Sequence, residues 1–395
     1  MGINAALIYG LLMPLLPVAD QRGAARVSTV DGRTCEGVVS VWQSGGTLRL
    51  RMKDGTETEI ASRDIDRVVF LPSRSRRPTG AWRVETSAGD RLFGDIIRGN
   101  AGTMTLRHHE LGEIDLRLDR LSTIARRGAA ANGSVAEVED QVLLANGDMT
   151  RGAIMAVSAD GVSILVSGET RERDLPWKVV RTIHFARSEV PAPDARAIRL
   201  RFDDGAELRV KSWNRRKDSV LAILPNRQSV TFDAGFAAFA EVMGGRRIWL
   251  TELRPASDVS IPFFNRRWPL VVDANAVGGP LAIAGEPYAR GLGLHAACRI
   301  RWRLDGTFER LTALVGIDDS AGERADADVV ISMDGRVLGR YRGLRYGQAP
   351  RPITLDLRGG QELTVEVGFG LHGDVQDRVD LVNPALIRRP ATPDP

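Results

Sequence analysis

The sequence is poor in cysteine, in aromatic residues and in long apolar runs, and each shortage excludes a class of protein. Two cysteines in 395 residues, Cys35 and Cys298, are too few for a domain held together by disulfides. No segment approaches the roughly 20 consecutive apolar residues of a membrane-spanning helix. Aromatic residues are only 6% of the chain, whereas hydrophobic residues are 43%, so aliphatic side chains must fill the cores. The length predicts two or more globular domains.

Lysine is scarce as well, with four lysines against 50 arginines, although the net charge is +4 and the pI is about 9.4. A basic chain can bind nucleic acid. Here the arginines alternate with acids, as in the Arg-Glu-Arg-Asp run of residues 171–174, and the densest basic run, residues 74–77, lies in a predicted linker. Such interleaved charge is typical of a solvated surface. We therefore do not expect nucleic acid as the main partner.

The N-terminus has the composition of an export signal. Its first 19 residues carry no charged side chain, and Ala5–Val18 is a run of 14 apolar residues. This length fits the apolar region of a signal peptide better than a membrane span. Small residues at Gly23 and Ala25 predict cleavage after Ala25, so residues 1–25 are expected to be a signal peptide and the protein to be secreted or periplasmic. The alternative is that this segment is a buried first element of the fold.

The first 243 residues contain four copies of one pattern. A turn glycine recurs at Gly32, Gly89, Gly147 and Gly205, at intervals of 57, 58 and 58 residues. A second glycine follows five residues later in the first three copies, and Val210 takes its place in the fourth. Two features in the same register four times indicate internal duplication. Each copy closes with two apolar residues three apart: Ile65/Val68, Leu121/Ile124, Val180/Ile183 and Phe236/Phe239.

Each copy is predicted to consist of short β-strands. Val27–Val30 leads into a turn at Gly32, and Thr47–Met52 alternates apolar and polar residues before a second turn at Gly55. Four or five short strands in about 45 residues make a small barrel, which resembles the Sm-like or SH3-like class. Segments rich in Arg, Ala, Gly, Ser or Pro separate the copies, as expected of linkers. The predicted β repeats are residues 26–71, 82–125, 141–186 and 197–243.

The repeats carry no predicted platform for nucleic-acid bases. Sm-like barrels often bind RNA, and such binding usually uses exposed aromatic side chains. The tryptophans Trp42, Trp82, Trp177 and Trp213 fall at different places in the repeat. We therefore expect the repeats to act as a spacer or as an interaction array for protein partners, with RNA binding as the alternative.

The pattern changes after residue 246, and three motifs follow in order. Tyr288–Ala296 reads Tyr-Ala-Arg-Gly-Leu-Gly-Leu-His-Ala, Val315–Asp319 reads Val-Gly-Ile-Asp-Asp, and an Asp-Gly hairpin follows at Asp334. In this order the motifs resemble the NPCBM family of carbohydrate-binding modules, over residues 247–388. The resemblance implies a β-sandwich jelly roll that binds terminal sugars and is appended to secreted bacterial proteins.

The chain departs from the NPCBM pattern near its end. The last motif of the family ends in an aromatic residue, whereas Leu381 and Val382 stand there in this chain. Sugar affinity is reduced if that position contacts sugar, and little changes if it belongs to the core. Another aromatic residue, Trp302, lies in the alternating strand Ile300–Leu304 and is predicted to be core.

Polar residues from three separate segments are the candidate sugar contacts. An imidazole follows the glycine turn, two acids follow an apolar strand, and two more acids lie near the C-terminus. Carboxylates and an imidazole can bind sugar hydroxyls, usually beside one aromatic face. Acids at strand ends more often cap turns, and a histidine between small residues is more often buried and hydrogen-bonded, so these remain alternatives. The candidates are His295, Asp318, Asp319, Asp377, Asp380 and the aromatic Tyr288.

The acids near the C-terminus suit one cofactor, calcium. The motifs of common catalytic sites are absent from the sequence, so catalysis is not expected. Asp374, Asp377 and Asp380 recur at intervals of three, and Ca²⁺ prefers oxygen ligands. The sequence contains no Gly-x-Ser-x-Gly, His-Glu-x-x-His or Walker motif. Asp318 and Asp319 are adjacent on one strand and point to opposite faces, so they do not form the facing pair that glycoside hydrolysis needs.

The sequence therefore predicts an exported, all-β, non-catalytic protein. Four small β-barrel-like repeats precede a β-sandwich jelly roll that binds a glycan or a cell-surface polysaccharide. Two alternatives stay open: a structural or protein-interaction protein without sugar binding, and a nucleic-acid-binding repeat protein.

Overall fold

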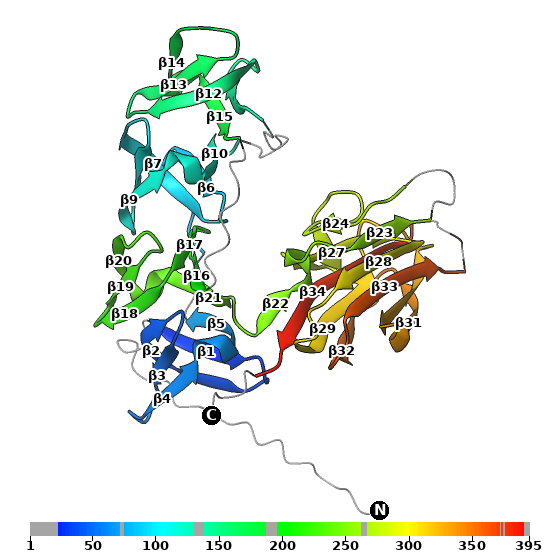
Figure 1. The fold of residues 1–395 in the computed structure, drawn as a ribbon. Helices are drawn as coiled ribbons and strands as arrows, with labels where there is room; N and C mark the ends of the chain where they lie inside the picture. Colours follow the sequence, from blue (N-terminus) through cyan, green and yellow to red (C-terminus); the bar gives the residue numbers. More distant parts are fainter. Residues whose placement is uncertain are drawn as a thin grey trace, which may run out of the picture. The chain divides into compact units, whose positions relative to one another are not determined.

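The computed structural model describes residues 23–71, 75–129, 138–186, 196–261, 267–371, 373 and 376–390. The chain divides into two compact units, the repeat unit (Met1–Met243) and the sandwich unit (Gly244–Pro395), and each is described by itself. Strands and single 3₁₀ turns make up the regular structure of the described residues, so the all-β prediction is confirmed (Figure 1). In the described part of the chain, we find no helix with the length and hydropathy needed to cross a membrane.

The four repeats share one order of elements. Each has a first strand, a long second strand, two shorter strands, a 3₁₀ turn and a closing strand. In the fourth repeat the second strand is divided into β17 and β18. The strands are β1 (Ala24–Thr29), β2 (Thr34–Gln43), β3 (Thr47–Arg51), β4 (Glu57–Ala61) and β5 (Ile65–Leu71); β6 (Trp82–Thr86), β7 (Arg91–Gly99), β8 (Thr103–His108), β9 (Gly112–Arg117) and β10 (Leu121–Arg126); β11 (Asp140–Leu144), β12 (Met149–Val157), β13 (Gly161–Val166), β14 (Glu172–Pro176) and β15 (Val180–His184); β16 (Ala197–Phe202), β17 (Glu207–Val210), β18 (Ser212–Arg216), β19 (Ser219–Ile223), β20 (Ser229–Asp233) and β21 (Ala237–Met243). The 3₁₀ turns are η2 (Ser62–Asp64), η3 (Leu118–Arg120), η4 (Trp177–Val179) and η5 (Ala234–Phe236).

The turn glycines occupy equivalent positions in all four repeats. Gly32, Gly89, Gly147 and Gly205 have φ of 85°, 87°, 96° and 82°. Each donates its backbone N–H to the carbonyl of the residue three positions earlier. A positive φ is readily adopted only by glycine, which explains why this residue recurs at the turn. The prediction of equivalent turns is confirmed.

Each repeat is an open sheet, and its strands do not close into a barrel. In the first repeat the hydrogen-bonded order is β5-β1-β2-β3-β4, and η2 connects β4 to β5 without pairing them among the described residues. The alternating pattern predicted for the third strand holds, since Leu48 and Leu50 are buried and the residues between them are exposed. Alternation places these leucines on the core face of the sheet.

The repeats follow one another in space in the order third, second, fourth, first (Figure 1). Closing strands pair in two of the three joints. In the joint of repeats 2 and 3, β10 pairs with β15 and places Ile124 opposite Ile183. In the joint of repeats 1 and 4, β5 pairs with β21 and places Val68 opposite Ala240. The closing apolar pairs recognised in the sequence thus lie on strands that join repeats, except that Phe236 lies in η5, just before β21.

Tryptophans fill these two joints. Trp42 lies opposite Trp213 across β2 and β18, and Trp213 stacks on Phe70 at 5.0 Å between ring centroids. Trp82 contacts Trp177 at 4.7 Å. These side chains bury apolar surface between repeats, which is the dominant favourable contribution to such packing. They do not form an exposed stacking platform.

The first strand begins before the predicted start of the first repeat. Ala24 and Ala25 belong to β1, and Ala25 is fully buried. Cleavage after Ala25 would remove two paired residues from β1, and the cleavage site stays a prediction. The rest of the predicted signal peptide, residues 1–22, lies outside the described residues, and export stays a prediction.

The sandwich unit consists of two large antiparallel sheets and a separate two-stranded sheet, β25-β26. One has the order β24-β27-β34-β29-β32 with β22 added along β34, and the other has the order β23-β28-β33-β30-β31. Its core includes Trp302, as predicted, and it also includes Leu381 and Val382, so the departure from the family motif lies in the core. The strands are β22 (Arg247–Trp249), β23 (Ser257–Ser260), β24 (Val271–Val272), β25 (Leu281–Ile283), β26 (Glu286–Tyr288), β27 (Gly291–His295), β28 (Cys298–Arg303), β29 (Phe308–Ile317), β30 (Asp326–Met333), β31 (Arg336–Arg345), β32 (Arg351–Asp356), β33 (Glu362–Phe369) and β34 (Arg378–Arg388), and η6 is Leu250–Glu252.

Candidate functional site

Strand β34 brings the three predicted polar segments to one end of its sheet. It lies between β27 and β29, so His295 at the end of β27 is opposite Arg378 at the start of β34. The N–H of Asp318, just after β29, donates to the carbonyl of Arg378. The N–H of Ala296 donates to the carbonyl of Asp377. His295, Asp318 and Asp377 therefore lie at the same end of the sandwich.

Asp318 and Asp380 form a buried carboxyl pair in this region. Asp380 lies on β34 between Gly293 and Gly316 of the flanking strands, which places no side chain over it from either neighbour. Burial, and then the hydrogen bond and charge of Asp318, raise the pKa of Asp380 to about 9. Asp380 is therefore protonated at neutral pH and donates to Asp318.

The carboxylate of Asp318 accepts hydrogen bonds that hold a neighbouring loop. Its Oδ1 accepts hydrogen bonds from Asn275 Nδ2 at 3.0 Å and from the N–H of Ser320 at 2.8 Å. Its Oδ2 accepts from the N–H of Ala282 at 3.3 Å. Asp318 and Asp380 are both fully buried, and the hydrogen bonds of Asp318 are those of an acid that holds a loop.

The other two predicted acids also accept bonds from backbone donors. Asp319 accepts from the N–H groups of Ala284 and Gly285, both at 2.8 Å, and so holds the turn between β25 and β26. The buried Asp377 accepts from the N–H of Asp326 at 3.1 Å. The turn-capping alternative recognised in the sequence describes these contacts.

Tyr288 lies beside the segment that two of the other candidates hold. It ends β26 opposite Leu281 and packs against the cluster of Leu281, Ile283 and Val382. The N–H of Ala282, the residue after Leu281, donates to Asp318 Oδ2, and the Ala282 carbonyl accepts from the N–H of Asp319. Burial raises the pKa of Tyr288. Tyr288 is therefore close to the backbone that Asp318 and Asp319 bind, and its contact with sugar stays a prediction.

His295 is stacked on a tryptophan that the sequence reasoning missed. The rings of Trp268 and His295 are 4.5 Å apart and inclined by only 4°. His295 Nδ1 lies 2.7 Å from the carbonyl oxygen of Ala296, which can only accept, so Nδ1 carries a proton. His295 is buried and Trp268 is half-buried. The available signal was a tryptophan beside Pro269, outside any strand pattern.

The predicted calcium ligands do not assemble into a recognisable site in the described residues. Asp374 lies outside them, and Asp377 and Asp380 face different partners, as above. Among the described residues, a group of His and Asp side chains brings its potential metal ligand atoms close together. This group lies in the repeat unit. Calcium binding stays a prediction.

That group is His108, His109 and Asp204, at the joint of repeats 2 and 4. His108 Nδ1 accepts hydrogen bonds from the N–H groups of Glu110 and Leu111, at 3.1 and 3.3 Å. The ring proton is therefore on Nε2, 3.0 Å from Asp204 Oδ2. A metal ion needs the lone pair of that nitrogen, so the tautomer favours a hydrogen bond between the repeats over metal ligation.

Burial and charge adjust the pKa values of this cluster. Burial alone would raise the pKa of Asp204, but hydrogen bonds from His108 and from the N–H of Ala206 outweigh it and leave the pKa lowered. Burial, and then the neighbouring His108, lower the pKa of His109. At this joint the carboxylate form of Asp204 and the neutral form of His109 are therefore favoured.

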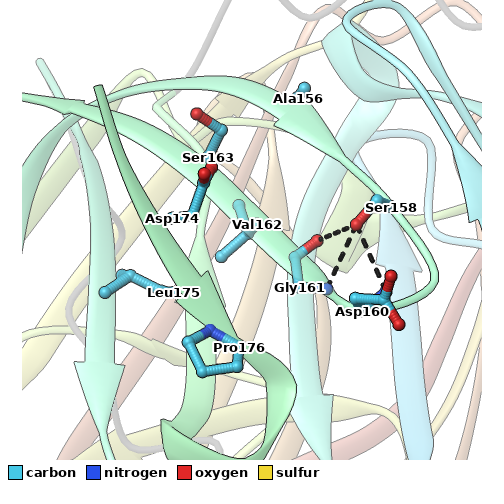
Figure 2. A pocket seen from close by; sticks show the side chains of 9 residues that line it. All are labelled: Ala156, Ser158, Asp160, Gly161, Val162, Ser163, Asp174, Leu175 and Pro176. Carbon is cyan, nitrogen blue, oxygen red and sulfur yellow. Dashed lines mark hydrogen bonds between the residues drawn. The ribbon is translucent and has the colours of Figure 1, made fainter. Parts of the chain in front are cut away.

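Two hollows lie in the repeat unit. One, of about 350 Å³, lies between repeats 2 and 4 and is lined by Ile114, Leu116, Leu208 and Leu224 among others. The other, of about 380 Å³, lies in repeat 3 beside the end of β14. Figure 2 shows the second hollow, where the Ser158 hydroxyl bonds across the turn that leads into β13.

Comparison with known proteins gives the C-terminal region its family. The sequence profile of the NPCBM/NEW2 domain matches residues 246–387. Residues 246–387 are an NPCBM/NEW2 domain. This agrees with the resemblance predicted from the motifs, and it covers about a third of the chain.

One curated relative matches part of the chain. It is a Renibacterium salmoninarum protein whose name describes an endo-alpha-N-acetylgalactosaminidase, and it is 33% identical over 96 residues. The match covers 24% of this chain and 6% of that protein, so the chain spans a small part of the relative's length.

Solved structures of carbohydrate-binding modules resemble the chain at low identity. A CBM51 module from Clostridium perfringens, in complex with methyl-galactose, is 20% identical and covers 35% of this chain and 99% of its own, with a TM-score of 0.33. Tandem CBM51 modules of a family 98 glycoside hydrolase from Streptococcus pneumoniae are 13% identical and cover 88% of this chain and 93% of their own, also with a TM-score of 0.33.

Proposed function

We propose that the NPCBM/NEW2 domain binds a glycan or a cell-surface polysaccharide at the end of the sandwich where Trp268 stacks on His295. The family match supports sugar binding, and the observation that carries the proposed location is the flat stacking of these two rings. A sugar ring needs one aromatic face and a few oriented polar groups. A half-buried indole held parallel to a buried imidazole offers such a face.

The residues at this end have different roles in the proposal. Trp268 supplies the apolar face for the sugar ring. His295 is a positioning residue, because its ring is fixed by the Ala296 carbonyl and supports the indole from behind. Asp318 holds the adjoining loop, and neither Asp318 nor Asp380 contacts the sugar, since both are fully buried.

The domain acts without catalysis in this proposal. Glycoside hydrolysis needs two carboxyl groups roughly 5–10 Å apart on either side of an accessible bond. Asp318 and Asp380 instead share a hydrogen bond and are enclosed by protein. The name of the Renibacterium salmoninarum relative describes a much longer protein, of which the matched segment is 6%.

The repeats serve as a spacer or interaction array in an exported protein. The export proposal rests on the uncharged, apolar N-terminal sequence. The array proposal rests on the tryptophans, which pack in the joints between repeats. Tryptophans packed in this way are not available to stack on nucleic-acid bases.

A glycan array tests the proposal, with the full chain and the His295→Ala variant as probes. Galactose and N-acetylgalactosamine glycans belong in the panel because of the relative's name. We expect the wild type to bind one group of related glycans, and the variant to lose roughly 90% of that signal while keeping its circular dichroism spectrum. Absence of binding across a broad panel would favour the structural or protein-interaction alternative.

A further inference from the structure

The joint between repeats 2 and 4 differs from the other two joints, because it is built by the turns at the start of the second strands. Arg91 of β7 pairs with Glu207 of β17, and each residue is two positions after its turn glycine. Arg209 binds the carboxylate of Asp90 through Nε at 3.0 Å and Nη2 at 2.9 Å. The pairing of equivalent residues gives this joint approximate two-fold symmetry.

In sequence terms the joint follows a simple rule. The residue two positions after the turn glycine pairs with the equivalent residue of the other repeat, as Arg91 does with Glu207. The residue one position after the glycine, Asp90, meets the residue four positions after the glycine, Arg209. An isologous interface between two copies of one repeat needs these two positions to be complementary within that repeat.

Repeat 3 has complementary residues at these positions. Asp148 follows its turn glycine by one position, Met149 by two and Arg151 by four. All three are exposed, and Met149 is 48% exposed. In repeat 2 the residue equivalent to Asp148 is Asp90, which is only 8% exposed because repeat 4 covers it.

The backbone beside these residues is open as well. Pairing of β12 with β13 begins at Gly152, and the carbonyl of Arg151 accepts from the N–H of Ser167, so in the described part of the chain the free edge of β12 is at Met149 and Thr150. In repeat 2, the N–H of Asp115 on β9 donates to Gln228 of repeat 4. The equivalent residue on β14 is Asp174, which lines the open hollow in Figure 2.

We propose that repeat 3 docks a second copy of this chain, in the same mode by which repeat 2 docks repeat 4. Met149 lies against Met149 of the second copy on the two-fold axis. Asp148 of each copy binds Arg151 of the other, which gives two ion pairs. This docking buries an exposed apolar side chain and pairs two exposed charges in each copy.

The same rule explains why the assembly stops at two copies. If repeat 3 met repeat 1 of another copy, Asp148 would face Glu36 and Arg151 would face Arg33. Like charges across an interface select against such a head-to-tail filament. In repeat 1, Glu36 is already paired with Arg26 at 2.8 Å and Arg33 lies 3.8 Å from Asp31.

Charge reversal in the full chain tests the proposal by analytical ultracentrifugation. The wild type is expected to form dimers at about 100 µM, a concentration at which a Kd near 10 µM gives mostly dimer. Arg151→Asp puts two carboxylates in the docking turn, and Asp148→Arg puts two guanidinium groups there. Each variant alone is expected to bind itself at least about tenfold more weakly.

An equimolar mixture of the two variants should restore the dimer, because each Asp148 then meets an Arg151 and each new Asp meets a new Arg. Glu36→Arg at the equivalent turn of repeat 1 is the matched control and should leave the dimer unchanged. A wild type that stays monomeric, a dimer indifferent to both reversals, or a mixture that does not re-form dimers would each overturn the proposal.

Discussion

The repeat unit and the sandwich unit both bury carboxylates, but they use them differently. In the repeats, Asp90 and Asp204 pair with Arg209 and His108 of a neighbouring repeat, so the buried charge joins modules. In the sandwich, Asp318 accepts bonds from loop donors and from a protonated Asp380, so the buried acids hold loops in place. The same residue type is thus an inter-repeat contact in one unit and a loop anchor in the other.

The difference follows from what surrounds each acid. A buried carboxylate needs a cation, several N–H donors or a proton. The repeats supply cations from the adjacent module, whereas β34 places Asp380 between two glycine positions and opposite another acid. Buried acids therefore indicate a joint only where an arginine or histidine from another segment reaches them.

The largest expected effect is the loss of an inter-repeat ion pair. Asp90→Ala leaves the Arg209 guanidinium buried without its carboxylate, which we expect to destabilise the repeat unit by about 3 kcal/mol. Asp119→Asn removes an exposed acid of the same repeat that is paired with Arg117, and is the control expected to have little effect. Calorimetric unfolding of the full chain measures both, and equal effects would contradict the assigned role of Asp90.

The second effect is a pH dependence confined to the sandwich. Unfolded, Asp380 ionises near pH 4, whereas folded it keeps its proton to about pH 9. Between these values the folded state binds more protons, so stability falls as the pH rises. We expect the melting temperature of the sandwich to fall by roughly 5–10 °C from pH 5 to pH 9.

Asp380→Asn should remove most of this dependence. The amide keeps the shape and a hydrogen-bond donor toward Asp318, but it does not titrate. Melting curves of the variant at pH 5 and pH 9 should nearly coincide. A variant that keeps the full dependence would show that another group is responsible.

The smallest effect compares the four turn glycines. A Cβ at Gly32, Gly89, Gly147 or Gly205 meets no atom within 4 Å, so alanine adds only the cost of a positive φ, about 1 kcal/mol. The four single variants should therefore be equally destabilised in urea unfolding. Gly102→Ala, at a position outside the positive-φ region, is the control. Four unequal costs would weaken the equivalence of the repeats.

The sequence predicted features that rest on local chemistry. Turn glycines, alternating strands and closing apolar pairs each follow from backbone geometry, so the repeats could be recognised before the structure. The spatial order of the repeats could not, because it depends on which faces fit together: Trp42 with Trp213 and Trp82 with Trp177. Spacing in the sequence carries no information about that choice.

The candidate site was predicted in part for the same reason. The order of motifs placed His295, Asp318 and Asp377 in one domain, and the strand register brings them to one end of it. An acid after a strand looks the same in the sequence whether it faces solvent or Asn275, so the burial of Asp318 was not foreseen. Trp268 lies outside every motif, and only the folded chain reveals its contact with His295.

The most direct test of the account is calorimetric titration of the full chain with a glycan that it binds. Trp268→Ala should weaken binding by about 30-fold or more, because a stacked tryptophan contributes at least about 2 kcal/mol at such a site. Trp249→Ala is the matched control. This half-buried tryptophan of the same unit contacts Arg247 and Arg290. Its strand pairs with β34 at Ala385, seven residues after Arg378, so it lies away from the proposed site. We predict wild-type affinity for Trp249→Ala and a large loss for Trp268→Ala; unchanged affinity in a folded Trp268→Ala variant would contradict the assigned site.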